Sequence, residues 1–256
     1  MLDPVQDVVA DDFLVRIVST VRTLDSRLQS GNNIMSGRTA IVAGASGLVG
    51  RHCLRRLLAS GLHEHVVAFV RGPLNVTHKR LEQRTVDFER LGRMSAFPRV
   101  QDVFCCLGTT MKKAGSEAAF RKVDYEYVVR LAETSLRTGA DYFYLVSAIG
   151  ADPKSRVFYS RVKGEAEDSV AKLGFAGLHI FRPSFLIGQR TEKRPGEAAG
   201  IAAARFFSIA LVGPARKYRP IKADTVARAM VVVARERPAG KHVYTVDDME
   251  GLATLP

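Results

Sequence analysis

Residues 39–50 read Thr-Ala-Ile-Val-Ala-Gly-Ala-Ser-Gly-Leu-Val-Gly, a short apolar run followed by three glycines spaced Gly-x-x-Gly-x-x-Gly. A helical pattern continues from Leu48 to Ser60. Glycines at such a turn let a pyrophosphate approach the backbone, and a helix that begins there offers free N–H groups and the positive end of its dipole. An ordinary glycine-rich turn is the alternative interpretation. The position of the glycines, directly after a strand and at the start of a helix, favours a phosphate-binding loop, and their spacing differs from the Gly-x-Gly-x-x-Gly of the commonest dehydrogenases. Its candidate ligand contacts are Gly44, Ser46, Gly47, Leu48, Val49 and Gly50.

Further apolar runs alternate with helical patterns along the rest of the chain. Strands are predicted at 66–70, 103–107, 142–146 and 179–181, and helices at 124–138 and 158–173. This alternation is typical of an α/β fold with a doubly wound parallel sheet, so we predict a Rossmann-like domain over residues 37–256. The region after Pro183 is less regular, which predicts that residues 184–256 contribute a small substrate cap.

The first 36 residues form a separate segment in the sequence pattern. Apolar residues recur at three- and four-residue steps from Val5 to Leu28, which is typical of an amphipathic helix. We expect this N-terminal helical appendage to pack on the domain or on a partner subunit of a homo-oligomer. Met35 stands just before the first strand, so translation from Met35 is an alternative that would leave the helix out.

Composition limits the classes of protein to be considered. The 256 residues are 46% hydrophobic and 25% charged, which excludes a disordered chain, a collagen-like fibre and a coiled coil. Lys and Arg number 38 against 26 Asp and Glu, but they are spread from Arg38 to Lys241. Without a basic cluster or a nucleic-acid motif, the positive charge better suits an acidic cofactor or substrate than nucleic acid.

The same composition bears on location and on metals. Three cysteines without a C-x-x-C pair and six histidines without ligand spacing predict no metal and a reducing, cytoplasmic compartment. The most membrane-like stretch, residues 198–215, contains Arg205 and is rich in Ala. We therefore expect a core helix there and no membrane span.

The residue after the second predicted strand points to the cofactor. NAD enzymes usually place an acid there, bonded to the ribose 2′-hydroxyl. Here the strand ends Phe69-Val70-Arg71-Gly72, without an acid at its tip. A guanidinium can hold a 2′-phosphate with two parallel hydrogen bonds, so Arg71 favours NADP(H) over NAD(H). A solvated surface arginine is the alternative interpretation.

Three residues form a candidate catalytic set. Tyr159 and Lys163 stand four residues apart in a predicted helix, which places them on one face, and Ser147 ends a predicted strand twelve residues earlier. A nearby ammonium favours the phenolate and makes a tyrosine a better acid–base catalyst, while Ser147 would orient the substrate oxygen. A second Tyr-x-x-x-Lys, Tyr218 with Lys222, contains a proline that is unsuited to a helix interior.

These features together resemble the short-chain dehydrogenase/reductase superfamily, among its extended and atypical members. The resemblance runs from about Thr39 to Val246 and is closest to the Tat-interacting oxidoreductase-like branch. The segments that carry it are Val86-Asp87-Phe88, Phe104-Cys105-Cys106-Leu107-Gly108-Thr109-Thr110, Lys113-Ala114-Gly115, Gly150-Ala151-Asp152, Val162-Lys163-Gly164-Glu165, Phe181-Arg182-Pro183 and Arg194-Pro195-Gly196-Glu197.

The resemblance implies further cofactor contacts. Asp87 and Phe88 would flank the adenine, and Leu107, Gly108 and Thr109 would line the cofactor. Tyr159 would also contact the cofactor, Lys163 would hold the nicotinamide ribose, and Pro183 would border the nicotinamide. The expected activity is NADP(H)-dependent hydride transfer to or from a carbonyl or alcohol of a small molecule. The alternative is an NADPH-binding regulatory or sensor protein without turnover.

Overall fold

The computed structural model describes residues 37–94, 97–188 and 218–255. The predicted N-terminal helix, Met35 and the stretch 198–215 lie outside these residues, as does the Arg194–Glu197 motif.

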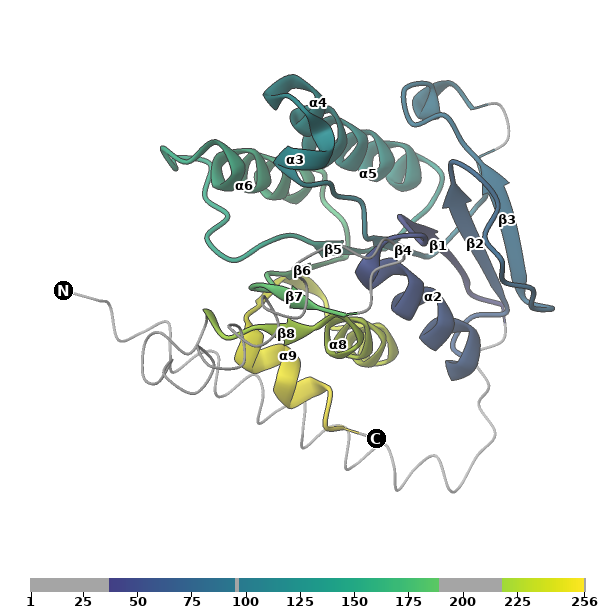
Figure 1. Cartoon of the computed structure of the whole chain (residues 1–256). Helices are drawn as coiled ribbons and strands as arrows, with labels where there is room; N and C mark the ends of the chain where they lie inside the picture. The colour runs from purple at the N-terminus through teal and green to yellow at the C-terminus, as the bar shows by residue number, and fades with distance from the viewer. Residues whose placement is uncertain (1–36, 95–96, 189–217, 256) are drawn as a thin grey trace. The chain divides into compact units, whose positions relative to one another are not determined.

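Seven strands form one sheet in the order β3-β2-β1-β4-β5-β6-β9, and every neighbouring pair is parallel (Figure 1). A separate parallel pair is formed by β7 and β8. The strands are β1 (Thr39–Ala43), β2 (His65–Val70), β3 (Leu81–Thr85), β4 (Asp102–Cys105), β5 (Tyr142–Val146), β6 (Gly177–Phe181), β7 (Leu186–Ile187), β8 (Ile221–Lys222) and β9 (Gly240–Tyr244).

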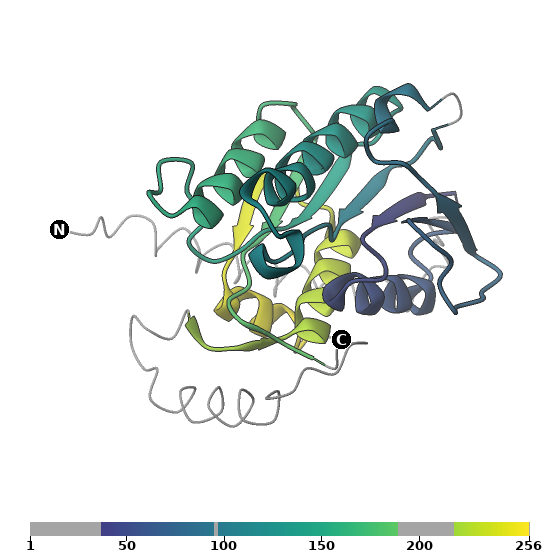
Figure 2. The same cartoon turned by 45° about the horizontal axis from the view of Figure 1, so that its top comes forward.

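Helices cover both faces of the sheet, with α5 and α6 on one face and α2 and α8 on the other (Figure 2). The helical elements are α2 (Leu48–Ser60), the 3₁₀ turn η1 (Leu91–Arg93), α3 (Met111–Ala114), α4 (Glu117–Arg121), the π-helical turn η2 (Lys122–Glu126), α5 (Tyr127–Arg137), α6 (Phe158–Ala171), α8 (Ala223–Glu236) and α9 (Val246–Leu252). This two-sided cover is the doubly wound arrangement expected from the alternation of strands and helices.

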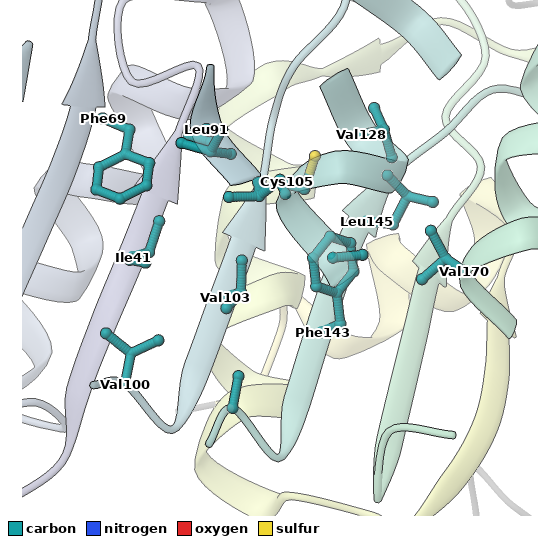
Figure 3. Packing of buried hydrophobic residues seen from close by; sticks show 14 of the residues in the cluster. Ile41, Phe69, Leu91, Val100, Val103, Cys105, Val128, Phe143, Leu145 and Val170 are labelled. Carbon is teal, nitrogen blue, oxygen red and sulfur yellow. The ribbon is translucent and has the colours of Figure 1, made fainter. Parts of the chain in front are cut away.

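The core on one face shows why these short strands are nearly all apolar. Alternate residues of neighbouring strands, such as Ile41, Val103 and Phe143, point to the same side and are fully buried. Val128 of α5 and Val170 of α6 close over them (Figure 3). Strands buried on both faces require apolar side chains at successive positions, and this explains their runs of Val, Ile and Phe.

The strand order reverses beside β1. The chain passes from β1 to β2 and β3 on one side of it, and then returns to β4 on its other side. In open α/β sheets the crevice at the carboxyl ends of the strands, at such a reversal, is where ligands bind. The glycine loop after β1 and the segment after β4 both start at this point.

The parallel α/β prediction is confirmed, and β1, α2 and β5 have the predicted limits. Within the region predicted to contribute the cap, α8 packs on α2 and β9 extends the main sheet beside β6. Tyr218 and Lys222 do not share a helix, since Lys222 lies in β8. None of the helices in the described residues is long and apolar enough to cross a membrane.

Candidate functional site

The loop after β1 is packed so tightly that two of its glycines leave no room for a side chain. Gly44 has a φ of +81°, and a Cβ there would lie 2.4 Å from the Cys106 carbonyl oxygen. A Cβ on Gly50 would lie 2.1 Å from the Gly44 carbonyl oxygen. The loop is therefore pressed against both the end of β4 and the first turn of α2, as a turn that admits a pyrophosphate requires.

The start of α2 fits an anion. The N-cap is Gly47, and among the described residues no side chain caps the helix or places an acid in its first turn. Ser46 is exposed beside it, while Leu48 is half-buried and Val49 is buried. The N–H groups of this first turn and the positive end of the helix dipole suit a dinucleotide pyrophosphate.

The C-terminal part of the chain also reaches this loop. A Cβ on Gly188, directly after β7, would lie 2.9 Å from Cδ1 of Leu48. The segment that follows Pro183 therefore passes beside the candidate cofactor loop.

The predicted adenosine contacts lie beyond β2 and β3. Arg71 is exposed directly after β2, and within the described part of the chain it forms no ion pair. Asp87 is also exposed, and its Oδ1 accepts a hydrogen bond of 2.9 Å from the Glu89 N–H. Phe88 is 5% exposed and stacks on Tyr127 with ring centroids 5.6 Å apart, so it contributes mainly to the core beneath the site.

The segment after β4 is tied to a buried acid that sequence reasoning missed. Leu107 packs against the core and Gly108 is exposed. The Thr109 N–H donates a 2.8 Å hydrogen bond to Oδ2 of Asp124, which lies in η2. A Cβ on Gly108 would lie 3.3 Å from the other carboxylate oxygen. The predicted cofactor-lining segment is thus fixed by Asp124.

Lys163 is buried in α6 and points to the same acid. Its Nζ lies 3.2 Å from Oδ1 of Asp124 and donates to the Val146 carbonyl oxygen at 3.4 Å. Burial is the largest single influence and disfavours the ammonium, but the charge and hydrogen bond of Asp124, together with Tyr159 and Cys105, outweigh it and raise the pKa of Lys163. The lysine is therefore charged at neutral pH.

Tyr159 lies in the first turn of α6, against Phe120 of α4, with ring centroids 5.3 Å apart. Burial raises the pKa of the phenol; Lys163 acts to lower it and Asp124 to raise it further. The sequence predicted a pKa lowered by Lys163. The lysine does act in that direction, but the overall shift is upward because burial and Asp124 dominate. The hydroxyl is therefore protonated at neutral pH.

Ser147 directs its hydroxyl elsewhere. It donates to Oε1 of Glu167, which lies one helical turn after Lys163 and is almost completely buried. Arg182 pairs with the same carboxylate, with its Nη2 2.5 Å from Oε2. Pro183 follows and is buried, and its carbonyl oxygen accepts a 2.9 Å hydrogen bond from the Ile149 N–H. Ser147 and Arg182 thus fasten the ends of β5 and β6 to α6.

Comparison with known proteins agrees with this geometry. Residues 44–194 match a family described as NAD(P)H-binding. The chain is 37% identical over 201 residues to Protein HTATIP2 of Rattus norvegicus, covering 77% of this chain and 81% of that protein. It is 33% identical over 175 residues to a protein of Emericella nidulans named fmp52, mitochondrial, covering 66% of this chain and 73% of that one.

Solved structures share the fold at lower identity. MoeE5 in complex with UDP-glucose and NAD has a TM-score of 0.61 at 18% identity, covering 83% of this chain and 79% of that one. UDP-glucose 4-epimerase from Thermotoga maritima has a TM-score of 0.58 at 18% identity, covering 84% and 81%. With the glycine loop, the family match and these relatives, the chain belongs to the NAD(P)H-binding family and is a relative of HTATIP2.

Proposed function

We propose that this protein is an NADP(H)-dependent oxidoreductase that transfers hydride to or from a carbonyl or alcohol of a small molecule. The observation that carries the proposal is the pair Tyr159 and Lys163 on α6. Both lie in the first turns of α6, and Lys163 reaches the acid that holds the Thr109 segment after β4. A proton donor and a fixed positive charge beside a dinucleotide loop are what carbonyl reduction requires.

Each of the three candidate catalytic side chains would have its own role in the reaction. When bound, the nicotinamide supplies or accepts the hydride. Tyr159 gives a proton to the carbonyl oxygen, because its hydroxyl is protonated at neutral pH. Lys163 holds a positive charge near the phenol and the ribose, where it stabilises the phenolate that forms. Ser147 can donate to the substrate oxygen only after its hydroxyl leaves Glu167.

The preference for NADP(H) rests on Arg71. It is exposed, it follows the strand where NAD enzymes place an acid, and no carboxylate among the described residues neutralises it. A 2′-phosphate would supply that neutralising charge.

A second candidate is an NADPH sensor whose occupancy controls a partner. The observation in its favour is the Ser147 hydroxyl, which donates its proton to the buried carboxylate of Glu167. The two candidates differ in turnover and agree in cofactor binding.

The test is NADPH oxidation, followed spectroscopically against a panel of aldehydes, ketones and quinones, with NADPH affinity measured by calorimetry. Substrate-dependent oxidation that is lost in Tyr159→Phe supports the enzyme. Tight NADPH binding without oxidation of any panel member favours the sensor. A cytoplasmic location and assembly into a homo-oligomer stay predictions, to be checked by cell fractionation and light scattering; the fungal relatives are named mitochondrial.

A further inference from the structure

Asp124 is a buried acid with a defined set of partners. It is 1% exposed and lies in η2, a π-helical turn between α4 and α5. π-helical turns are rare, and they are frequent at functional sites because they redirect a side chain out of the regular helical pattern.

Both oxygens of the Asp124 carboxylate are held. The backbone N–H of Thr109 donates to one oxygen at 2.8 Å, and Nζ of Lys163 lies 3.2 Å from the other. The lysine is also fixed by the Val146 carbonyl oxygen. The carboxylate therefore cannot turn away from the lysine without losing the Thr109 hydrogen bond in a buried site, which would be costly.

The charges that act on Tyr159 come from two elements: Lys163 lies on its own helix, and Asp124 comes from η2. The Cys105 thiol at the end of β4 acts on Lys163. Burial and a neighbouring cysteine raise the pKa of the Cys105 thiol to about 12, so it adds no charge at neutral pH. The phenol thus experiences an ion pair, and the charge of the lysine is largely compensated.

We propose that Asp124 is a positioning residue that acts through Lys163: its carboxylate compensates the lysine and keeps the Tyr159 hydroxyl in its proton-donating form. This inference rests on the proposed function and deepens it, because a site that starts with a protonated tyrosine is built to reduce a carbonyl. The carbonyl carbon receives hydride from the reduced dinucleotide and the carbonyl oxygen receives the phenol proton. The alcohol and the oxidised dinucleotide form, and the phenolate regains a proton from solvent.

The test follows the ionisation of Tyr159 directly. Protein labelled with ¹³C in its tyrosine rings is titrated with base, and the Tyr159 signal is identified by its loss in Tyr159→Phe. In Asp124→Asn the lysine charge is no longer compensated, so the tyrosine is expected to ionise at lower pH than in the wild type. Ionisation at an unchanged or higher pH overturns the proposal.

A second variant covers the case in which Asp124→Asn leaves a buried lysine without a partner and fails to fold. The double variant Asp124→Asn/Lys163→Met is titrated in the same way, because removing both charges of a buried pair is tolerated far better than removing one. If the carboxylate compensates the lysine, Tyr159 in the double variant is expected to ionise close to the wild-type pH. A clearly higher pH, as the loss of an uncompensated lysine would give, counts against the proposal.

The titration needs no substrate, so it separates the two proposals. If Tyr159 titrates at lower pH in Asp124→Asn but the protein reduces no carbonyl, the role of Asp124 stands and the enzymatic function is refuted. Where turnover exists, the alkaline limb of the kcat profile for reduction should move to lower pH in Asp124→Asn. If the protein turns over but neither the Tyr159 titration nor the alkaline limb of the kcat profile moves in Asp124→Asn, the enzymatic function stands and the role of Asp124 is refuted.

Discussion

The first turns of α2 and α6 both contribute to the candidate site, but the start of α2 and nearby Arg71 lack side-chain partners among the described residues, whereas the buried charges of α6 are paired. The start of α2 has no side-chain cap among the described residues, and nearby Arg71 has no carboxylate partner there. On α6, Lys163 and Glu167 are both buried and both paired, with Asp124 and Arg182 respectively. The α2 region is thus suited to gain a ligand, while the charges of α6 are fixed by the fold. Changes near α2 should therefore alter cofactor binding, and changes in α6 should alter turnover or stability.

The largest expected effect is at the glycine loop. Gly47→Glu would place a carboxylate at the N-cap of α2, where the pyrophosphate is expected, and repulsion should abolish binding of both dinucleotides. Calorimetric titration measures the binding, and circular dichroism confirms that the fold is kept. Unchanged binding in the folded variant would show that the nucleotide lies elsewhere.

On the other helix, Tyr159→Phe should remove turnover and leave NADPH binding intact, because only the transferable proton is lost. A positioned general acid contributes about 10²–10⁴-fold, which sets the expected loss in kcat. Tyr218→Phe is the matched control, since Tyr218 lies outside α6, and it should be nearly silent. A near-normal kcat in Tyr159→Phe would refute the assigned role.

The paired charges of α6 predict a cost in stability. Glu167→Ala leaves Arg182 and Ser147 without their shared acceptor. We expect a loss of about 3 kcal/mol in the free energy of unfolding, the lower end for breaking a buried pair, because Arg182 is partly exposed. Urea denaturation measures it. Glu165→Ala on the same helix is the control: its pair with Arg121 is much more exposed, and its loss should cost less than about 1 kcal/mol. Equal costs would contradict the contrast.

Arg71→Ala should weaken the binding of NADPH and leave the binding of NADH almost unchanged. Loss of charge-assisted bonds to the 2′-phosphate is expected to weaken NADPH binding by about 1.5–3 kcal/mol, and NADH binding should change little. Calorimetry with both cofactors makes the comparison. Equal weakening of NADH and NADPH, or a wild-type preference for NADH, would refute the assignment.

The smallest effect is expected at the N-terminus. A chain that starts at Met35 retains β1 and the glycine loop, so NADPH affinity should be unchanged. Light scattering then shows whether residues 1–34 affect assembly. Loss of binding in a folded chain of this length would show that the segment contributes to the cofactor site.

Helices and strands whose signals lie close together in the sequence were predicted well. β1 and α2 follow from an apolar run, glycines and a helical pattern within 22 residues, and the structure has the same limits. β3 was missed because Leu81–Thr85 reads Leu-Glu-Gln-Arg-Thr, which lacks an apolar alternation. It is an edge strand with one neighbour, so polar side chains are tolerated there.

The partners of the candidate catalytic residues could not be predicted. Asp124 was placed at the start of a helix, where an acid is ordinary, but the helix begins at Glu117 and Asp124 lies in a π-helical turn. Ser147 and Glu167 stand twenty residues apart, and only the packing of α6 on β5 brings them together. Neither periodicity nor spacing encodes such contacts.

The π-helical turn makes the site dependent on chain length as well as on residue identity. Each residue of an α-helix turns the chain by about 100°. Deleting Tyr125 or Glu126 would convert α4, η2 and α5 into one regular helix. Because the buried residues of α5 fix that helix on the sheet, Asp124 would turn by about 100° away from Lys163. A chain one residue shorter would therefore have a more regular helix here and, with every functional side chain still present, no ion pair beside Tyr159.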